Sequence, residues 1–236
     1  LLHIIAYICG LMIKKITLRN TILSFAVGVF TLNTSLEAKT KKQTSTAPKA
    51  VSLFDGETLK GWKTVKKSNL AKWSVIDGVI TCGDGKKKIL QNTYLCTEKE
   101  YEDFEFRCLF RLSGDHKSGF INAGIQYRSL LKHGKIIGYQ ADIGKGYWGN
   151  IWDEHRRGNL AKGDMSTLKH ILKEDAWNSY IIRCNGRRHE LYINGVKTAD
   201  YIERGNVPAM GVIAIQLHSG GKAKVEYKHL TITKIK

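Results

Sequence analysis

The stretch YIIRCNGRRHELYINGVKTADY, residues 180–201, decides the fold class of this chain. It holds two Asn-Gly pairs, at residues 185–186 and 194–195, and each pair separates runs rich in β-branched and aromatic residues. Two-residue loops of this composition are the strongest short-range signal of a β-hairpin, because both loop residues must adopt a positive φ. The stretch therefore predicts consecutive antiparallel hairpins.

The same pattern extends over most of the chain. Asp77-Gly78 gives a third hairpin signal inside WSVIDGVITC, and helical periodicity is missing except for a turn near residues 168–173. Further strands are expected at residues 103–112, 121–129, 137–143, 148–153, 210–217 and 223–235. Many evenly spaced strands in one domain must close into a sandwich or barrel, because one open sheet would leave an apolar face exposed. We therefore predict an all-β domain.

Residues 1–38 have the composition of a secretory signal peptide. A basic region at residues 14–19 precedes an apolar run at residues 21–32, and the small residue Ala38 follows. A retained membrane anchor is the alternative, but it needs about 18–20 uninterrupted apolar residues, and this run is shorter. We expect a periplasmic or secreted protein, with no membrane span after processing. Because the first methionine is Met12, residues 1–11 are interpreted as lying upstream of the true translation start.

The remaining chain divides into a short polar linker, residues 39–50, and one domain, residues 51–236, long enough to bury its own core. The formal net charge of the full chain is +17. Such a surplus is typical of nucleic-acid-binding proteins, but these lysines are scattered rather than clustered, and export makes that partner unsuitable. We expect no nucleic-acid partner; an anionic glycan or envelope surface fits the charge better.

Four cysteines lie within the predicted domain. Cys82 and Cys96 lie on neighbouring predicted strands and could form a disulfide in an oxidising compartment. Cys108 and Cys184 lie on apolar strand faces, which favours an interpretation as small buried hydrophobic residues. Because no C-x-x-C or H-E-x-x-H spacing is present, neither a structural zinc site nor a zincin is expected.

Residues 122–158, NAGIQYRSLLKHGKIIGYQADIGKGYWGNIWDEHRRG, are more polar than a framework sheet requires. Their apolar residues alternate with amide, carboxylate and guanidinium side chains: Asn122, Gln126, Arg128, Gln140, Asp142, Asp153, Glu154, Arg156 and Arg157. Alternation of this kind predicts strands with one buried face, and the polar face then carries many groups able to bind a ligand. The segment is therefore interpreted as the lining of a cleft.

Several motifs along the chain, taken in order, resemble one known family. They are LFDG at residues 53–56, LKGW at 59–62, WSVIDGVI at 73–80, YEDFE at 101–105, NAGI at 122–125 with Arg128, GYQAD at 138–142, WN at 177–178, NG at 194–195 and QLH at 216–218. Together they look like the 3-keto-disaccharide hydrolase domain, formerly a domain of unknown function, over essentially all of residues 51–236. The resemblance implies an antiparallel jelly-roll sandwich of the concanavalin A type, a bacterial exported protein and cleavage of 3-keto glycosides.

The chemistry of a 3-keto glycoside defines the groups that its cleavage requires. The ketone acidifies the C2 proton, so a base can remove it and the C1 substituent can leave by β-elimination, after which water can add. The candidate bases are Asp142, Glu154 and His218. Arg128 and Arg157 are candidates for stabilising the developing negative charge, because a guanidinium stays charged and offers several donors.

The remaining candidates would bind substrate. Asn122, Tyr127, Gln140, Asp153 and Gln216 are expected to bind sugar hydroxyls, and Trp148 or Trp152 to present a ring face to the pyranose. A divalent metal ion that polarises the keto oxygen could be held by Asp142 and Glu154 together with Gln140 and His218. Apart from this metal ion, no cofactor is expected from the sequence. Residues 144–149 fit G-x-G-x-x-G, but without the following helix that a dinucleotide site requires.

Each functional interpretation has a structural alternative. Asp142 and Arg128 could form an ion pair across adjacent strands, the charged run at residues 153–157 could be a solvated loop, and His218 could simply cap a turn. The alternative function is a carbohydrate-binding sandwich without catalysis. Convergence of Asp142, Glu154, Arg128 and His218 on one concave face would favour the enzyme. A separate sugar dehydrogenase would then have to supply the keto substrate.

Overall fold

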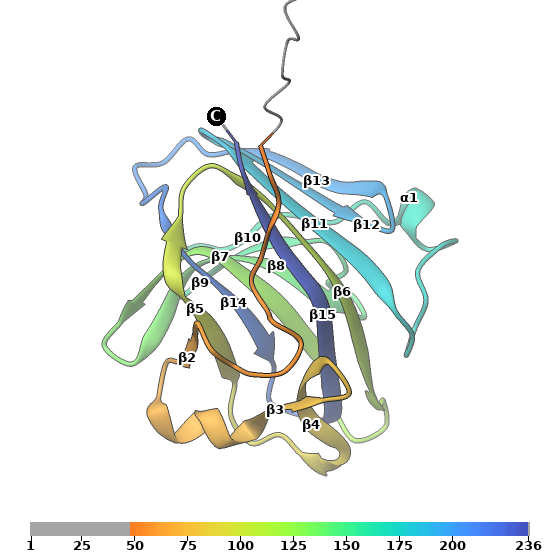
Figure 1. Cartoon of the computed structure of the whole chain (residues 1–236). Helices are drawn as coiled ribbons and strands as arrows, with labels where there is room; N and C mark the ends of the chain where they lie inside the picture. The colour runs from red at the N-terminus through yellow and green to blue at the C-terminus, as the bar shows by residue number, and fades with distance from the viewer. Residues whose placement is uncertain (1–47, 236) are drawn as a thin grey trace, which may run out of the picture. The chain divides into compact units, whose positions relative to one another are not determined.

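Two antiparallel sheets pack face to face in the computed structural model, which describes residues 48–235 (Figure 1). Sheet A has the spatial order β13 (Val196–Ile202), β12 (Arg188–Ile193), β11 (Asn178–Asn185), β6 (Phe104–Asp115), β15 (Lys222–Lys234), β4 (Val79–Lys88) and β3 (Trp73–Ile76), with β1 (Val51–Ser52) against β15. Sheet B has the order β10 (Gly158–Ala161), β9 (Ile151–Glu154), β8 (Lys135–Gly144), β7 (Asn122–Lys132), β14 (Gly211–Leu217), β5 (Thr93–Tyr101) and β2 (Trp62–Thr64). The predicted all-β jelly-roll sandwich is confirmed.

The three hairpins predicted from Asp-Gly and Asn-Gly pairs are all present. They join β3 to β4, β11 to β12 and β12 to β13, and all three strand pairs are antiparallel. Asn194 and Gly195 have φ values of 49° and 80°, as a two-residue hairpin loop requires. The tight turns fix the register of each hairpin, so that every second residue faces the other sheet.

The core fills the space between the sheets. In β6, Phe104, Phe106 and Phe110 are fully buried, whereas Glu105 and Arg107 alternate with them on the outer face. β11 repeats the pattern with the buried Tyr180, Ile182 and Cys184. Each large apolar side chain removed from water contributes about 1.5–3 kcal/mol to the stability of the fold. Burial of these side chains is therefore the main contribution that holds the two sheets together.

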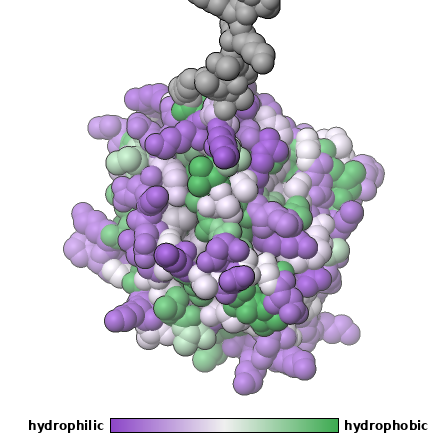
Figure 2. All heavy atoms as spheres, in the orientation of Figure 1, coloured by the Kyte–Doolittle hydropathy of each residue, from purple (hydrophilic) through white to green (hydrophobic). Residues whose placement is uncertain are grey.

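The outer face of sheet A is a charged surface whose members largely pair with one another. Arg111 binds Glu226 through two hydrogen bonds of 2.6 and 2.8 Å, and Arg188 binds Asp200 in the same two-point manner. Figure 2 shows that hydrophilic side chains dominate the side of the molecule turned to the viewer, with only small separate apolar patches. This agrees with the scattered lysines of the sequence.

The disulfide that the sequence allowed between Cys82 and Cys96 is not formed. All four cysteines of the described chain are free and buried. Cys82 in β4 belongs to sheet A and Cys96 in β5 belongs to sheet B, because consecutive strands cross from one sheet to the other. Burial raises the pKa of both thiols to about 12. The interpretation of Cys108 and Cys184 as buried hydrophobic residues is confirmed.

The few helices are short. α1 (Met165–Leu168) ends where the predicted turn at residues 168–173 was expected to begin, and Asp164 caps it by accepting a hydrogen bond from the backbone N–H of Ser166. The 3-10 helix η1 (Lys67–Lys72) was not predicted. No helix among residues 48–235 is long and apolar enough to span a membrane. The signal peptide predicted for residues 1–38, and most of the linker, lie outside the described residues.

Neighbouring isoleucines of β11 provide a test of the alternation. Ile182→Ala removes a fully buried side chain and is expected to lower the free energy of unfolding by about 2–5 kcal/mol. Ile181→Ala, on the half-exposed outer face, is expected to cost less than about 1.5 kcal/mol. Urea unfolding of the two variants measures the difference, and equal losses would contradict the assignment of faces.

Candidate functional site

The outer face of sheet B carries a hollow of about 370 Å³. The inner residues of β7, β8, β9 and β14 pack into the core, so the residues between them face away from it. The hollow is lined by Asn122, Gln140, Asp142, Trp152, Glu154 and His155, with Phe120, Tyr147 and His218 around them. Of the predicted catalytic residues, Asp142, Glu154 and His218 therefore come together.

Strand register brings the polar side chains side by side. Gln126 is directly opposite Gln140 on the neighbouring strand, and Gln140 is in turn opposite Trp152. Gly124 is opposite Asp142, and a Cβ atom at Gly124 would lie only 2.6 Å from Cδ of Gln140. The absence of a side chain at residue 124 is therefore what leaves room for the Gln140 amide.

A directed chain of hydrogen bonds ends at the carboxylate of Asp142. Ser129 Oγ donates to Gln126 Oε1 at 3.0 Å, and Gln126 Nε2 donates to Gln140 Oε1 at 2.7 Å. Gln140 Nε2 then donates to Asp142 Oδ1 at 2.5 Å. All four side chains are buried. Because every link donates towards Asp142, the chain holds one carboxylate oxygen fixed and leaves the other oxygen available to the hollow.

Burial dominates the electrostatics of Asp142. Its side chain is only 3% exposed, and this loss of hydration raises its pKa from 3.8 to about 7. The negative charge of Glu154 raises the pKa further, whereas the hydrogen bond from Gln140 lowers it. Desolvation outweighs the single hydrogen bond because an ionised carboxylate loses most of its hydration at this depth. Asp142 is thus a carboxyl group that exchanges its proton near neutral pH.

Glu154 and His155 lie at the end of β9. Glu154 is half-buried, and His155 Nε2 lies 3.5 Å from Glu154 Oε1, which makes an ion pair when the imidazole is protonated. His155 itself is exposed and has a positive φ of 56°, at the start of the turn that leads to β10. The sequence-based candidates did not include His155, although it belongs to the charged run at residues 153–157.

His218 enters the hollow from the end of β14. Its backbone N–H donates to the carbonyl oxygen of Asn122 at 3.0 Å, which ties the end of β14 to the start of β7. Its Nδ1 lies 2.6 Å from the carbonyl oxygen of Ser219. A carbonyl oxygen can only accept, so Nδ1 carries the proton and the Nε2 atom of the neutral ring is an acceptor. His218 therefore both binds the turn that follows β14, as its structural interpretation expected, and lines the hollow.

Two aromatic residues that were not predicted form the edge of the hollow. Phe120 and Tyr147 are 38% and 37% exposed, and their rings meet edge to face at 5.6 Å. Phe120 also contacts the ring of His218 edge to face at 5.0 Å. These residues come from the loops before β7 and after β8, so only their strand-end positions in the sequence could have indicated them.

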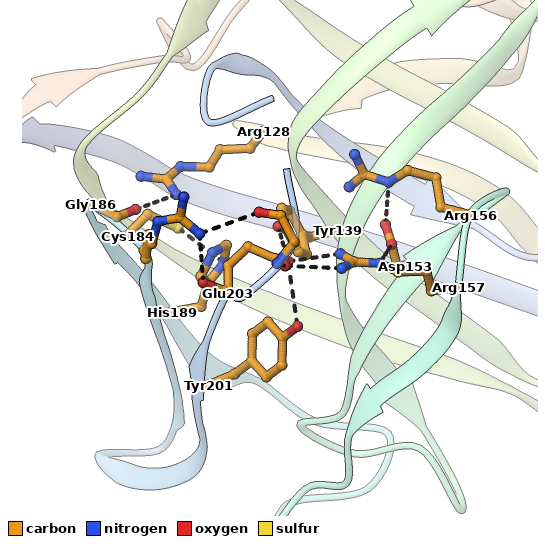
Figure 3. Close-up of polar contacts among 12 residues, drawn as sticks. Arg128, Tyr139, Asp153, Arg156, Arg157, Cys184, Gly186, His189, Tyr201 and Glu203 are labelled. Atoms are coloured by element: carbon orange, nitrogen blue, oxygen red, sulfur yellow. Dashed lines mark hydrogen bonds and ion pairs between the residues drawn. The ribbon is translucent and has the colours of Figure 1, made fainter. Parts of the chain in front are cut away.

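Arg128 does not reach the hollow. Strict alternation would place it beside Gln126, but β7 contains a register shift between Tyr127 and Leu130, and Arg128 has a φ of 46°. A bulge of this kind redirects a side chain. The guanidinium donates to the carbonyl oxygen of Glu102 and to Asp103, at 2.8 and 2.7 Å. It also donates to the carbonyl oxygen of Gly186 at 2.8 Å (Figure 3). The structural alternative, an ion pair of Arg128 with Asp142, is not formed either, because the carboxylate partner of Arg128 is Asp103.

Asp153 and Arg157 also lie away from the hollow. Asp153 alternates with Trp152 and Glu154 along β9 and is fully buried, where it accepts hydrogen bonds from Arg156 and Arg157 (Figure 3). Arg157 also donates twice to Glu203. Hydrogen bonds from Arg157 hold the pKa of Glu203 well below its ordinary range. These charges form a structural cluster at one end of sheet B.

The remaining substrate-binding candidates are divided between the hollow and the core. Asn122, Gln140 and Trp152 line the hollow, as predicted. Tyr127 instead stacks on Tyr139 in the core at 5.4 Å, and Trp148 packs 6.3 Å from Phe110. Tyr127 follows strand alternation to the inner face, whereas Trp148 reaches the core from the turn between β8 and β9. Gln216 is fully buried, and its Nε2 donates to Tyr94 OH at 3.1 Å.

The side chains around the hollow do not form a set of ligands for the divalent metal ion that the sequence left open. Among residues 48–235, no three His, Cys, Asp or Glu side chains come together in a way that could hold a metal ion. One oxygen of Asp142 is already taken by Gln140, and Nδ1 of His218 is taken by Ser219.

Residues 49–233 match the family described as the 3-keto-alpha-glucoside-1,2-lyase-like domain. The chain belongs to this family. The resemblance predicted from the sequence is confirmed, and the family places this 3-keto-alpha-glucoside-1,2-lyase-like domain among carbohydrate-related proteins. No curated protein matches the chain.

Solved structures share the fold of this 3-keto-alpha-glucoside-1,2-lyase-like domain. A proposed glycosyl hydrolase from Parabacteroides distasonis is 18% identical with a TM-score of 0.58, and the match covers 79% of this chain and 94% of that one. A carbohydrate-binding module from Bacillus subtilis is 14% identical with a TM-score of 0.55, covering 74% and 96%. A Bacillus subtilis protein of unknown function with a galectin-like fold is 12% identical with a TM-score of 0.53, covering 72% and 92%. At these identities the likeness concerns the fold.

The buried carboxyl group predicts an unusual pH dependence of stability. Because the pKa of Asp142 is raised by folding, its proton stabilises the folded chain below about pH 4, and this stabilisation is lost as the pH rises through about 7. Asp142→Asn cannot ionise, so we expect it to be more stable than the wild type at pH 8, by roughly 1–4 kcal/mol, and similar to it near pH 4. Urea unfolding at both pH values measures this.

Asp200→Asn is the matched control for stability. Hydrogen bonds from Arg188 and Lys197 hold the pKa of Asp200 below its ordinary range, so this substitution should lower stability at pH 8. A gain from Asp142→Asn that is the same at pH 4 and pH 8 would contradict the raised pKa.

Proposed function

We propose that this protein cleaves 3-keto glycosides by elimination across C1 and C2, with Asp142 as the base that removes the C2 proton. The observation that carries the proposal is a carboxyl group at the floor of an open hollow with a pKa of about 7. A general base works best when its pKa lies near the working pH, because it is then both ionised and basic enough. The 1,2-lyase-like character of the family supports the same chemistry.

The reaction proceeds in two balanced steps. Asp142 takes the proton from C2, and the electron pair of that C–H bond moves towards the C3 ketone to give an enolate. The enolate then re-forms the ketone and a C1–C2 double bond while the C1–O bond breaks. The leaving oxygen takes up one proton. Where water later adds across the double bond, its oxygen bonds to C1 and its proton to C2, which completes a net hydrolysis.

The groups left in the hollow define how negative charge is stabilised. Because Arg128 and Arg157 are engaged elsewhere, no guanidinium of the predicted set faces the substrate. The Asn122 amide is then the donor for the enolate oxygen. The leaving oxygen takes its proton from His218 Nε2, which must first acquire one from water because that atom is an acceptor in the neutral ring. Glu154 increases the basicity of Asp142 through its charge. Trp152 offers a ring face on which the sugar can stack.

A protein with this activity requires a supply of oxidised sugar. No step of the elimination oxidises a hydroxyl group, so a separate sugar dehydrogenase must make the 3-keto glycoside. We further propose that the protein acts outside the cytoplasm, as the composition of residues 1–38 suggests.

A carbohydrate-binding module without catalysis is the second candidate. The fold it shares with the Bacillus subtilis binding module and the exposed pair of Phe120 and Tyr147 favour it. Binding alone requires no base, however, and leaves the buried Asp142 without a purpose. The two functions differ in one observable, the release of the leaving group from a 3-keto glycoside.

Release of p-nitrophenol from p-nitrophenyl 3-keto-glucoside tests the proposal. Asp142→Asn is expected to lower kcat by about 10²–10⁴-fold, because the general base is lost, while still binding the substrate in calorimetry. Asp200→Asn, the same chemical change on the outer face of sheet A, should keep wild-type activity. A wild-type protein that binds keto glycosides but never releases p-nitrophenol would establish the binding module instead.

The pH profile gives an independent test. Asp142 must be ionised to act as a base, so kcat/KM should fall about tenfold per pH unit below about pH 7. In Glu154→Gln the negative charge that raises the pKa of Asp142 is missing, so the inflection should move to lower pH, whatever the maximal rate becomes. An inflection that stays in place, or moves to higher pH, would contradict the coupling of the two carboxyl groups.

A further inference from the structure

A second hollow of about 420 Å³ adjoins the first and shares His155 and His218 with it. Its walls come from segments far apart in the sequence: the chain between β2 and η1, the chain between β4 and β5, and the β7–β8 hairpin. Both hollows fall in the size range of small-molecule sites. Two adjoining compartments that meet at two imidazoles suit a substrate with two parts joined by a scissile bond.

The two compartments carry opposite charge. Asp142 and Glu154 line the first hollow, whereas Lys66 and Lys135 line the second. Among residues 48–235, no Asp or Glu side chain lines the second hollow. Neither lysine forms an ion pair with any residue that the structure describes. On the outer face of sheet A, in contrast, Lys197 and Lys224 each bind carboxylates.

Neutral polar residues in the wall of the second hollow are held in place. Asn92 accepts a hydrogen bond from the backbone N–H of Ser219 at 2.9 Å, and its amide donates to Tyr94 OH at 3.4 Å. Gln216 donates to the same hydroxyl at 3.1 Å. Tyr94 thus forms a fixed part of the wall of the second hollow, and it belongs to the same apolar cluster as Ile136 and Ala214. The second hollow offers polar contacts, an apolar wall and unpaired positive charge.

We infer that the second hollow receives the leaving group, and that the preferred leaving group carries an anionic substituent, either a carboxylate or a sulfate ester. The inference rests on the proposed function, because that function places the keto sugar over Asp142 and its C1 oxygen towards His218. A leaving sugar then extends past the shared histidines towards Lys66 and Lys135. Each exposed lysine gives a modest attraction that salt weakens, and both lysines line the same hollow.

A pair of matched disaccharides tests the charge preference. In one, 3-keto-glucose is joined to glucose, and in the other the same linkage joins it to glucuronate. A third, with a 6-O-sulfated glucose, distinguishes sulfate from carboxylate. At low salt kcat/KM is expected to be about fivefold or more higher for at least one anionic substrate, and the preference should fall towards unity in 0.5 M NaCl. Equal values for all three substrates in the wild type would overturn the inference.

Substitution of the lysines assigns the effect to this compartment. The double variant Lys66→Gln/Lys135→Gln should reduce the preference to less than about twofold, while kcat/KM for the neutral disaccharide stays within about twofold of wild type. Lys132→Gln is the matched control, because it removes an exposed lysine from the same β7–β8 hairpin at a residue that does not line the hollow. A preference that survives the double variant, or is lost equally in the control, would place the anion elsewhere and overturn the inference.

Equilibrium binding separates a failure of this inference from a failure of the proposed function. The unoxidised disaccharides cannot undergo elimination, so their affinities, measured by calorimetry, depend on recognition alone. Tighter binding of the glucuronate or sulfate compound, lost in the double variant, would support the anionic compartment even if no 3-keto glycoside were cleaved. Cleavage of the 3-keto disaccharides without any charge preference in binding or kinetics would leave the proposed function intact and refute the anionic leaving group.

Discussion

The packing of sheet B against sheet A is the constraint on which the rest of the structure depends. Successive side chains of a strand point to opposite faces of the sheet, so when the odd-numbered residues are buried, the even-numbered residues lie on the outer face. Ala141 and Ile143 pack into the core, and Gln140 and Asp142 therefore point outwards. The same argument applies to Ile151 beside Trp152. Core packing therefore fixes which side chains face the candidate site, and the hydrogen-bonded sheet holds their backbone rigid.

Within this scaffold, burial disfavours the ionised form of the Asp142 carboxyl group. An exposed carboxylate is hydrated by water, whereas the Asp142 carboxylate has a single hydrogen bond from Gln140. The negative charge of Glu154 also repels that of ionised Asp142. The resulting instability of the ionised form is the source of its basicity. Sites that sacrifice stability for reactivity are common in enzymes, and here the loss is confined to one carboxyl group because Gln140, Gln126 and Ser129 satisfy one another.

The sequence was sufficient for the hairpins, the sandwich and the triplet of Asp142, Glu154 and His218, because these follow from turn chemistry and from polar residues at alternate positions. It was insufficient where backbone geometry departs from alternation. Arg128 belongs to a bulge, and periodicity cannot locate an inserted residue. Asp153 shows the second difficulty, since a charged residue buried with two arginines looks the same in sequence as one in a cleft. Cys82 and Cys96 show the third, because neighbours in sequence can belong to different sheets.

The bare position at Gly124 has consequences for how this family can diversify. The Gln140 amide occupies the space that any larger residue at 124 would claim, so the two positions can change only together. A lineage that acquires a side chain at 124 must give up the glutamine at 140, and with it the amide that donates to the carboxylate of Asp142. Residues 124 and 140 are therefore expected to be inherited as a unit, together with the support that the Gln140 amide gives to the carboxylate of Asp142.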